Sequence, residues 1–433
     1  MPPKENTKTR RQKRQINDVE YVSSAEATST LGVRRETLYT YVSRGLIKTV
    51  QRPGVKAKLY RKADVEKLRS RAVARSGGPQ VSHALRYGEP IAQTWISEIT
   101  AQGPRYRGVL ARDLVRDGRS FEFASELIWT GLARTRDIAW PALQETRPLE
   151  HLIKLASHPA DRVTPLKLLT LLTTSLSAFE QAEGDIQAAG LATYRRLLQT
   201  LAGAAGVFGP DARFSAPREG EFVAQCIARG LGLGDRVDAV QAIDAALVMS
   251  AEHELSAPSF AARICASTGA DLHACVATAM LTQSGAMQVG GAVEVEALID
   301  ALPSRLDPED ALSLAAAMGF MSNELPCFNH PLYEGEDPRS VVLLDMMERL
   351  TSYGPDTPKI RALVVGARQA GQHPNVFAAL VMLCKAMGLP NGTGAMLHTL
   401  ARTTGWIAHA LEQRLTGAML RPRARYMGQQ GSS

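Results

Sequence analysis

The chain has 433 residues, of which 45% are hydrophobic and 21% are charged. This composition is ordinary for a globular protein of two or three domains and excludes disordered and fibrous classes. No apolar run approaches the roughly 18 residues of a membrane span, and no hydrophobic segment follows the basic start MPPKENTKTRRQKRQ. We therefore expect a cytoplasmic protein without a membrane partner. The five cysteines lack metal-ligand spacing, so we expect reduced thiols and no metal site.

The positive charge is concentrated at one end of the chain. Residues 1–75 contain 19 Lys and Arg against 7 Asp and Glu, whereas the rest of the chain contains 31 against 36. Such asymmetry is typical of a small nucleic-acid module joined to a mildly acidic domain. We predict a basic tail over residues 1–19, although a merely solvated segment would explain the charge of residues 1–16 equally well.

Residues 20–74 have the pattern of a winged helix-turn-helix. A capping box of Ser23 and Glu26 predicts the start of a short helix, and Leu31-Gly32-Val33 predicts a tight turn. The segment RRETLYTYVSRG predicts a second helix, on which Leu38, Tyr41 and Val42 share one face. LIKTVQR and KLYR flank Pro53-Gly54 as a hairpin, and Ala63-Asp64 predicts the start of a closing helix.

This pattern resembles the winged helix-turn-helix of MerR-type regulators and excisionases over about residues 20–69. We favour DNA as its partner because the basic charge lies here, and a module kept for protein interaction is the alternative. A single module offers a small interface, so we expect the downstream domain to dimerise. The side chains expected to contact DNA are Arg34, Arg35, Thr37, Thr40, Arg44, Lys56, Lys58 and Arg61.

After a predicted linker over residues 75–90, which contains RSGGPQ, helical patterns dominate and predict an all-α class. The segment from Val237 to Leu281 predicts two long helices joined by a polar loop, and VFAALVMLCKAMG predicts a buried helix. The last long helix is predicted to be amphipathic, because apolar residues recur at three- and four-residue steps or their sums. These residues are Leu397, Leu400, Ile407, Leu411 and Leu415.

Four motifs in this region resemble the citrate synthase family. RYRGVLARDLVRDGRSFEFASELIWTG resembles the family's YRG…SFEEVAYLLW.G stretch, and HELSAPSFAAR resembles its HELNASTF helix entry. CFNHPLYEGEDPRS resembles GFGHPLY…DPR, and LARTTGWIAHALEQ followed by RPRARY matches the terminal helix and tail. Any one of these motifs is weak evidence, but four in the right order make the resemblance strong.

The resemblance implies an all-α homodimer in which a large domain (residues 91–285 and 373–433) and a small domain (residues 286–372) close over oxaloacetate and an acyl-CoA. It implies a Claisen condensation without a bound cofactor, with acyl-CoA as co-substrate. In that chemistry a base removes a proton from the acyl group, a donor holds the enol oxygen, and an acid protonates the ketone.

The half of the family's site that holds the dicarboxylate is largely retained. By resemblance, His253 stands at the ketone-side histidine, and His330 and Arg339 match a substrate-binding pair. Arg402 matches a carboxylate-binding arginine, and Arg421 matches the arginine that a partner subunit contributes. An arginine suits this task because its planar fork can grip a carboxylate with two hydrogen bonds.

The half that acts on the acyl-CoA is not retained. SGAMQVGG, residues 284–291, stands where the family has GPxHGG, which places Gln288 or, in the other alignment, Val289 at the enol-side histidine. HPNVFAALVML stands where the family has HPNVDFAL, so Phe377 occupies the position of the base, and no Asp or Glu lies between Gln369 and Leu411. Smaller departures are Ser256 for an asparagine, and Cys327 and Asn329 for glycines.

These departures favour a catalytically impaired sensor that binds a dicarboxylate of the oxaloacetate or citrate kind, with or without acyl-CoA, and reports it to DNA. Two alternatives stay open. One is an active citrate or 2-methylcitrate synthase with a base from elsewhere, and the other is an accessory subunit in a mixed dimer, where Arg421 completes the site of an intact paralogue.

Overall fold

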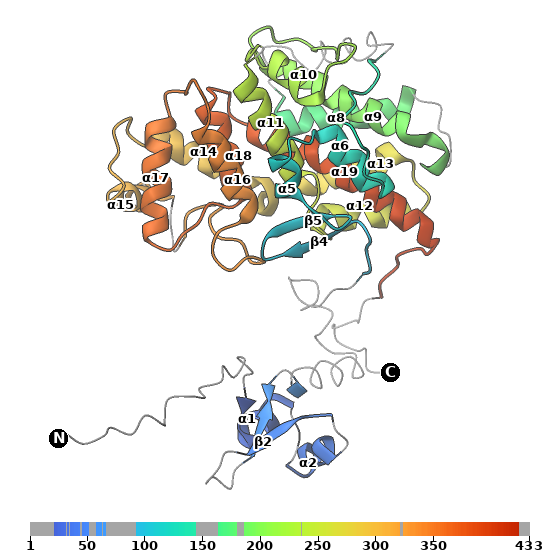
Figure 1. The fold of residues 1–433 in the computed structure, drawn as a ribbon, viewed down its shortest axis with the longest axis vertical. Coiled ribbons are helices and arrows are strands. Elements are labelled where there is room, and N and C mark those ends of the chain that lie inside the picture. The colour runs from blue at the N-terminus through green and yellow to red at the C-terminus, as the bar shows by residue number, and fades with distance from the viewer. Residues whose placement is uncertain are drawn as a thin grey trace, which may run out of the picture. The chain divides into compact units, whose positions relative to one another are not determined.

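The computed structural model describes residues 21–31, 33, 35–43, 46–51, 58–62, 64–65, 92–143, 163–179, 186–234, 236–320 and 324–423. The chain divides into two compact units, residues 1–93 and residues 94–433. Figure 1 labels most of their helices and some of their strands. The predicted basic tail and the predicted linker over residues 75–90 lie outside the described residues, and the finer division of the second unit into a large and a small domain stays a prediction.

The first unit contains two short helices and a three-stranded antiparallel sheet. The helices are α1 (Ser24–Leu31) and α2 (Arg35–Ser43), and the strands β1 (Tyr21–Val22), β2 (Thr49–Gln51) and β3 (Lys58–Arg61) pair in the order β1-β3-β2. The capping box is confirmed, because the Glu26 amide donates to Ser23 Oγ (3.2 Å) and the Ser23 amide donates to Glu26 Oε2 (2.7 Å). The antiparallel pairing of β2 and β3 confirms the hairpin, whose tip lies outside the described residues.

A small core holds these elements together. Its fully buried members are Ala27, Leu38, Ile47, Tyr60 and Val65, and the partly buried Val22, Leu31, Tyr41 and Val42 pack against them. The predicted apolar face of α2 is therefore confirmed. The core of the first unit encloses far less apolar surface than the core of the second unit, as expected for a domain of this size.

The second unit is built mainly of helices (Figure 1). They are α5 (Ala111–Arg116), α6 (Phe121–Thr130), α8 (Pro165–Phe179), α9 (Ile186–Ala204), α10 (Val223–Gly230), α11 (Val237–Ser250), α12 (Ala257–Ser267), α13 (Leu272–Gln283), α14 (Gly291–Ala301), α15 (Ala311–Ala317), α16 (Pro338–Glu348), α17 (Thr357–Gln369), α18 (Val376–Ala386) and α19 (Thr393–Thr416). A 3₁₀ turn covers Ala205–Phe208, and a π-helical turn, Ala286–Gly290, leads directly into α14.

The expectation of an all-α class is wrong in one place within the second unit. The segment that opens the first motif forms strands β4 (Ser97–Thr100), β5 (Gly103–Tyr106) and β6 (Val109–Leu110), which pair antiparallel in that order. The two-residue turn between β5 and β6 has positive φ at Arg107 (49°) and Gly108 (89°), the geometry that suits a tight hairpin. The class is therefore mostly helical with a small sheet.

The segment from Val237 to Leu281 forms three helices instead of the predicted two. After α12 the chain turns at Gly269, whose φ of +93° interrupts the helix. Asp271 then caps α13 by accepting a hydrogen bond from the Ala274 amide (2.8 Å). Helix breakers and caps of this kind are short signals inside an otherwise continuous apolar pattern, which explains the wrong prediction.

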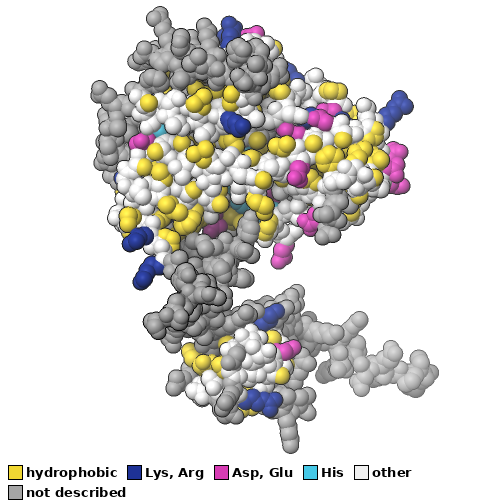
Figure 2. Space-filling view, turned by 180° about the vertical axis from the view of Figure 1, so that it is seen from behind, with side chains coloured by type: hydrophobic (Ala, Val, Ile, Leu, Met, Phe, Trp, Pro, Cys, Tyr) yellow, Lys and Arg dark blue, Asp and Glu magenta, His cyan; other side chains and the backbone are white. Residues whose placement is uncertain are grey.

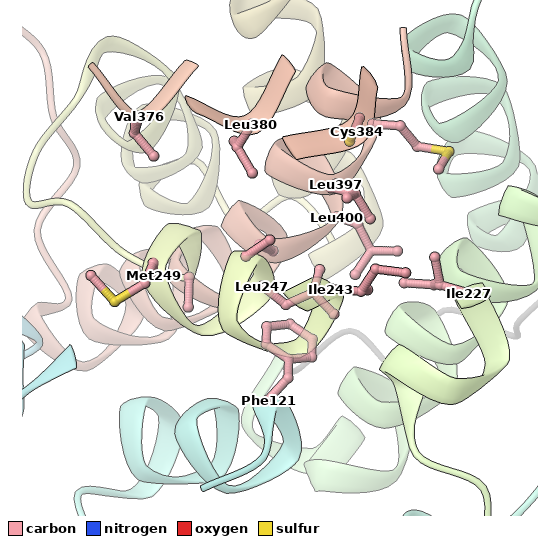
Figure 3. Packing of buried hydrophobic residues seen from close by; sticks show 14 of the residues in the cluster. Phe121, Ile227, Ile243, Leu247, Met249, Val376, Leu380, Cys384, Leu397 and Leu400 are labelled. Atoms are coloured by element: carbon pink, nitrogen blue, oxygen red, sulfur yellow. The ribbon is translucent and has the colours of Figure 1, made fainter. Parts of the chain in front are cut away.

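Helix α19 runs through the centre of the second unit and packs against α6, α8, α9, α11, α12, α13 and α18. Figure 3 shows its Leu397 and Leu400 among apolar side chains of α6, α10, α11 and α18. The predicted buried face is confirmed for Leu397, Leu400 and Ile407, and Leu411 packs against the core. Leu415, near the end of the helix, is 74% exposed, so its predicted burial is wrong. Among the described helices, none is both long and apolar enough to cross a membrane.

Candidate functional site

Two of the predicted histidines lie side by side with a tyrosine. His253 follows α11, and His330 and Tyr333 come from the segment before α16. The ring centroids of His253 and His330 are 5.3 Å apart, and His253 Nε2 lies 2.8 Å from Tyr333 Oη. The Leu332 amide donates to His330 Nδ1 (3.2 Å), so a neutral His330 ring carries its proton on Nε2. Among the described residues that nitrogen has no hydrogen-bond partner.

Arg339 lies beside this group and is held by a fork of two hydrogen bonds. Its Nε and Nη2 donate to the two carboxylate oxygens of Asp337 at 3.0 and 2.7 Å. Asp337 caps α16, and its Oδ2 also accepts from the Val376 amide at the start of α18 (3.0 Å). Both side chains are buried. No hydrogen bond to the described residues involves Arg339 Nη1.

Arg402 is the second buried arginine and comes from α19. Its Nη2 donates to Ser256 Oγ (3.0 Å) and Ser259 Oγ (2.9 Å) at the start of α12. Its Nη1 lies 3.3 Å from Glu252 Oε2 in an ion pair but has no hydrogen-bond partner within the described ranges. The serine found at position 256 thus orients Arg402 as well as capping α12.

A second layer of polar side chains holds the Glu252 carboxylate against Arg402. Its Oε1 accepts from Ser97 Oγ and from His409 Nε2, each at 3.2 Å. His409 is oriented in turn by Arg263, whose Nε donates to His409 Nδ1 (2.9 Å). Glu252 and His409 are fully buried. Because each side chain in this series of hydrogen bonds has a defined partner, Arg402 is held in one orientation.

Burial and the arginine charges make the histidines neutral. Burial lowers the pKa of His253 well below its usual value, and the Arg339 charge lowers it further. The same two causes lower the pKa of His330 to about 4. For Asp337 and Glu252, burial raises the pKa, but Arg339 and Arg402 respectively outweigh that effect and keep both carboxylates ionised. The imidazoles can therefore donate hydrogen bonds at neutral pH without being charged.

The segment that carries His330 keeps a glycine-like backbone although it lacks the expected glycines. Cys327 and Asn329 have φ of 57° and 59°, a region that costs a residue with a side chain about 1–2 kcal/mol. Hydrogen bonds hold this conformation: the Asn329 amide donates to the His373 carbonyl (2.6 Å), and the Asn375 amide donates to the Cys327 carbonyl (2.9 Å). The substitutions therefore preserve the path of the chain.

We use the name acyl side for Gln288 and Phe377, the positions expected by resemblance to act on an acyl group, together with His398, which contacts Phe377. Gln288 lies in the π-helical turn and is partly buried, and its side chain has no hydrogen-bond partner in the described chain, whereas Val289 packs against the core. The Phe377 ring lies on the His398 ring, with centroids 4.3 Å apart and an interplanar angle of 38°. A phenyl ring can neither accept a proton nor carry a charge, so position 377 offers no general base.

Several residues of the site were not predicted. Tyr333 and Glu252 were not among the predicted site residues, although they stand close in sequence to His330 and His253. His398 is buried and stands four residues before Arg402 on α19, a spacing that puts both side chains on one helix face. That spacing was the signal that could have identified it. We call His253, His330, Tyr333, Arg339, Arg402 and His398 the histidine–arginine cluster.

No hydrogen bond, ion pair or ring contact between described residues joins the remaining predicted residues to this cluster. Arg421 is exposed in the segment after α19 and has no hydrogen-bond or ion-pair partner among the described residues. Of the predicted DNA contacts, Arg35, Thr40 and Lys58 are exposed and Thr37 and Arg61 are partly buried, whereas Arg34, Arg44 and Lys56 lie outside the described residues. In the part of the chain that the structure describes, no three His, Cys, Asp or Glu side chains are arranged to hold a metal ion.

A cavity of about 490 Å³ lies elsewhere, between α5, α10, α11 and the end of α16. Asp244 of α11 lines it, accepts a hydrogen bond from the Phe121 amide (3.0 Å) and has no ion-pair partner in the described part of the chain. Burial and the nearby Asp137 raise the pKa of Asp244 to about 7, and burial and Asp244 raise the pKa of Glu122 to about 8. These unpaired carboxyls contrast with the arginine-paired carboxylates of the cluster.

Known proteins resemble this chain in sequence and in fold. Residues 86–423 match the family model described as citrate synthase, C-terminal domain. A 2-methylcitrate synthase of Shewanella oneidensis is 31% identical over 192 residues, which cover 43% of this chain and 50% of that protein. A citrate synthase of Haloferax volcanii is 28% identical over 342 residues, which cover 75% of this chain and 89% of that protein. For the first of these relatives the chain thus matches about half of its length.

Solved structures agree on the fold. A citrate synthase of Thermoplasma acidophilum, solved with carboxymethyl coenzyme A and oxaloacetate, has a TM-score of 0.63 at 19% identity and covers 79% of this chain and 95% of that chain. A citrate synthase of Pyrobaculum aerophilum has a TM-score of 0.62 at 21% identity, with coverages of 89% and 96%. The second unit therefore has the citrate synthase fold. Because the family model matches far more than half of the sequence, the chain belongs to the citrate synthase family.

Proposed function

We propose that the histidine–arginine cluster binds a small carboxylic acid with two or three carboxylates, of the oxaloacetate or citrate kind. The observation that carries this proposal is the pair of buried arginines, Arg339 and Arg402. Each is fixed through one part of its guanidinium group and keeps Nη1 without a hydrogen-bond partner among the described residues. Arg402 Nη1 is buried and, among the described residues, forms only the ion pair with Glu252. A ligand carboxylate would give the Nη1 donors of both arginines charge-assisted hydrogen bonds.

Condensation with an acyl-CoA is proposed to be weak or absent. The family reaction needs a base at the acyl group, and Phe377 cannot serve as one. The loss of a general base typically lowers a rate by about 10²–10⁴-fold. Acyl-CoA stays a candidate co-substrate or second ligand. We therefore expect carboxylate binding and catalytic turnover to separate in this protein, which is the behaviour of a sensor.

One pair of measurements on the full chain tests this function. Titration calorimetry with oxaloacetate, citrate and acetyl-CoA in turn is expected to show binding of at least one of the carboxylic acids. Release of free CoA from acetyl-CoA and oxaloacetate, followed with a thiol reagent, is expected to stay near background. Turnover of about 1 s⁻¹ or faster, within the range of ordinary enzymes, would show that another residue acts as base. Absence of carboxylate binding would contradict the function itself.

We also infer that residues 20–74 bind DNA. The excess of basic residues in this end of the chain supports this role, as do the exposed Arg35 and Lys58 on α2 and β3. Replacement of Arg34 and Arg35 by alanine is expected to weaken binding to duplex DNA. The affinity should also fall steeply with salt because phosphate contacts release counterions. Equal binding by residues 76–433 alone would contradict this assignment.

A dimer through the second unit would supply the paired geometry that a DNA-binding module needs. Apolar side chains are exposed on the neighbouring helices α8, α12 and α13, namely Leu171, Ile264 and Leu281. Figure 2 shows apolar side chains spread over much of one face of this unit. The exposed Arg421 fits a residue that acts on another subunit, in a homodimer or in a mixed dimer with an intact paralogue. Sedimentation of residues 76–433 tests the dimer, and a monomer would contradict it.

A further inference from the structure

His398 is a buried imidazole that the proposed function has not yet used. Its side chain stands one helix turn before Arg402 on α19, and its ring is covered on one side by Phe377. Only one of its two nitrogens, Nδ1, has a hydrogen-bond partner within the described ranges. The side chain as a whole is buried, and most buried polar side chains in proteins have their hydrogen-bonding groups paired, so the second nitrogen, Nε2, is a candidate donor to a ligand.

The neighbouring hydrogen bonds determine which nitrogen of His398 carries the proton. The Thr399 hydroxyl donates to the Ala395 carbonyl (2.8 Å), so its oxygen is left to accept from Gln283 Nε2 (3.4 Å). The same amide nitrogen lies 2.7 Å from His398 Nδ1. An amide nitrogen can only donate, so Nδ1 accepts, and the proton of the neutral ring is on Nε2. The second ring nitrogen is therefore a donor that needs an acceptor.

The electrostatic surroundings favour an acceptor with negative charge. Burial lowers the pKa of His398 well below its usual value, and the charges of Arg402 and Arg339 lower it further. The potential at the ring is therefore positive, which stabilises an anionic oxygen there. The carboxylates of Asp337 and Glu252 are already bound to those arginines. An aspartate at position 377 would repel a further carboxylate, whereas the Phe377 ring does not.

We propose that His398 donates through Nε2 to a third carboxylate of a citrate-like acid whose other carboxylates are bound by Arg339 and Arg402. The inference rests on the proposed carboxylate-binding function and makes it narrower. In this assignment the replacement of the base by Phe377 and the presence of His398 act together. Phe377 in place of the base removes a negative charge from the acyl side, and His398 supplies a hydrogen-bond donor. The third carboxylate can therefore occupy the space that an acyl group would take.

Calorimetry on the full chain, with citrate and oxaloacetate as separate probes, tests this role. His398→Leu is expected to weaken citrate binding by about 10-fold or more, the usual effect of one hydrogen bond to a charged group, and to change oxaloacetate binding by less than about twofold. His398→Gln retains a donor and should recover part of the citrate affinity. Equal losses for the two acids, or no loss of citrate affinity, would overturn the role of His398.

Two variants at position 377 provide an independent arm in case His398→Leu does not fold. Phe377→Asp is expected to weaken citrate binding more than Phe377→Asn, because the two side chains have nearly the same shape but only the first is charged. Equal citrate affinities for this pair would contradict the inference. If the wild-type protein binds neither acid, the proposed function itself fails. If it binds both acids and the variants leave the ratio of affinities unchanged, only the selection of a third carboxylate fails.

Discussion

The carboxylate side of the histidine–arginine cluster and the acyl side next to it differ in how their side chains are paired. On the carboxylate side, Arg339 is paired with Asp337 and Arg402 with Glu252, and further hydrogen bonds fix each carboxylate. On the acyl side, an aromatic ring and a neutral imidazole meet, and Gln288 has no hydrogen-bond partner among the described residues. Under the proposed function, the arginines that would hold a ligand are fixed by buried carboxylates, whereas the two positions that would act on an acyl group carry Gln288 and Phe377.

The largest effect is expected when the acyl side is converted. Gln288→His together with Phe377→Asp should raise CoA release from acetyl-CoA and oxaloacetate by at least about 10-fold over wild type, because it supplies both a base and a donor. The gain should stay below the roughly 10²–10⁴-fold of a well-placed base, since an error of about 1 Å in position costs about 10²-fold. Gln288→His with Phe377→Asn is the matched control, and an equal rate for this control would show that no base was created.

On the carboxylate side, Arg402→Lys should weaken oxaloacetate binding by about 10- to 100-fold. Lysine keeps the charge but cannot reproduce the fork that reaches both the serines and a ligand, and a hydrogen bond to a charged group contributes about 1.5–3 kcal/mol. Calorimetry measures the change. The exposed Arg349, which pairs with Asp345 on the surface, provides the control Arg349→Lys. Unchanged affinity in Arg402→Lys would exclude Arg402 from the binding site.

The neutral histidines predict a loss of stability in acid. The pKa of His330 is about 4 in the folded chain and about 6.5 in an unfolded chain. The unfolded state therefore binds more protons between these values, and stability falls as the pH falls through this interval. His330→Gln should flatten the pH dependence of Tm between about pH 6.5 and 4. An identical slope for the variant and wild type would show that His330 does not contribute.

Asp244, in the cavity between α5, α10, α11 and α16, predicts a smaller effect of the opposite sign: a loss of stability as the pH rises. Because the pKa of Asp244 is raised to about 7, the folded state binds more protons than the unfolded state at neutral pH, and stability falls as the pH rises from about 4 to 7. Asp244→Asn removes this loss and keeps the acceptor for Phe121. We expect its Tm to exceed that of wild type by about 2 °C or more at pH 8 and to match it at pH 4. A lower Tm at pH 8 would contradict the raised pKa.

The mostly helical character, the two helices and the hairpin of the first unit, and the site residues His253, His330, Arg339 and Arg402 all have signals in the sequence. Each has a local signal: apolar spacing on α19, the capping box of Ser23 and Glu26, and motifs in which His253 or Arg402 stands at a fixed place. These signals depend on neighbours within a few residues, so a single sequence contains them. The replacement of the base by Phe377 was also visible, because it is a change of residue type inside a motif.

Two local signals were hidden by the surrounding apolar pattern. The break between α12 and α13 occurs at Gly269, which has a positive φ, and the small β4–β6 sheet has its turn at Arg107 and Gly108. Tertiary structure decided the rest. The contact of Phe377 with His398 joins side chains from two helices, and the bond from Gln283 to His398 joins residues 115 positions apart. Composition and periodicity report which face of a helix is buried, but not which side chain of another helix lies against it. The proton position on His398 follows only from packing in three dimensions, as does the lack, among the described residues, of a hydrogen bond to Nη1 of Arg339 and Arg402.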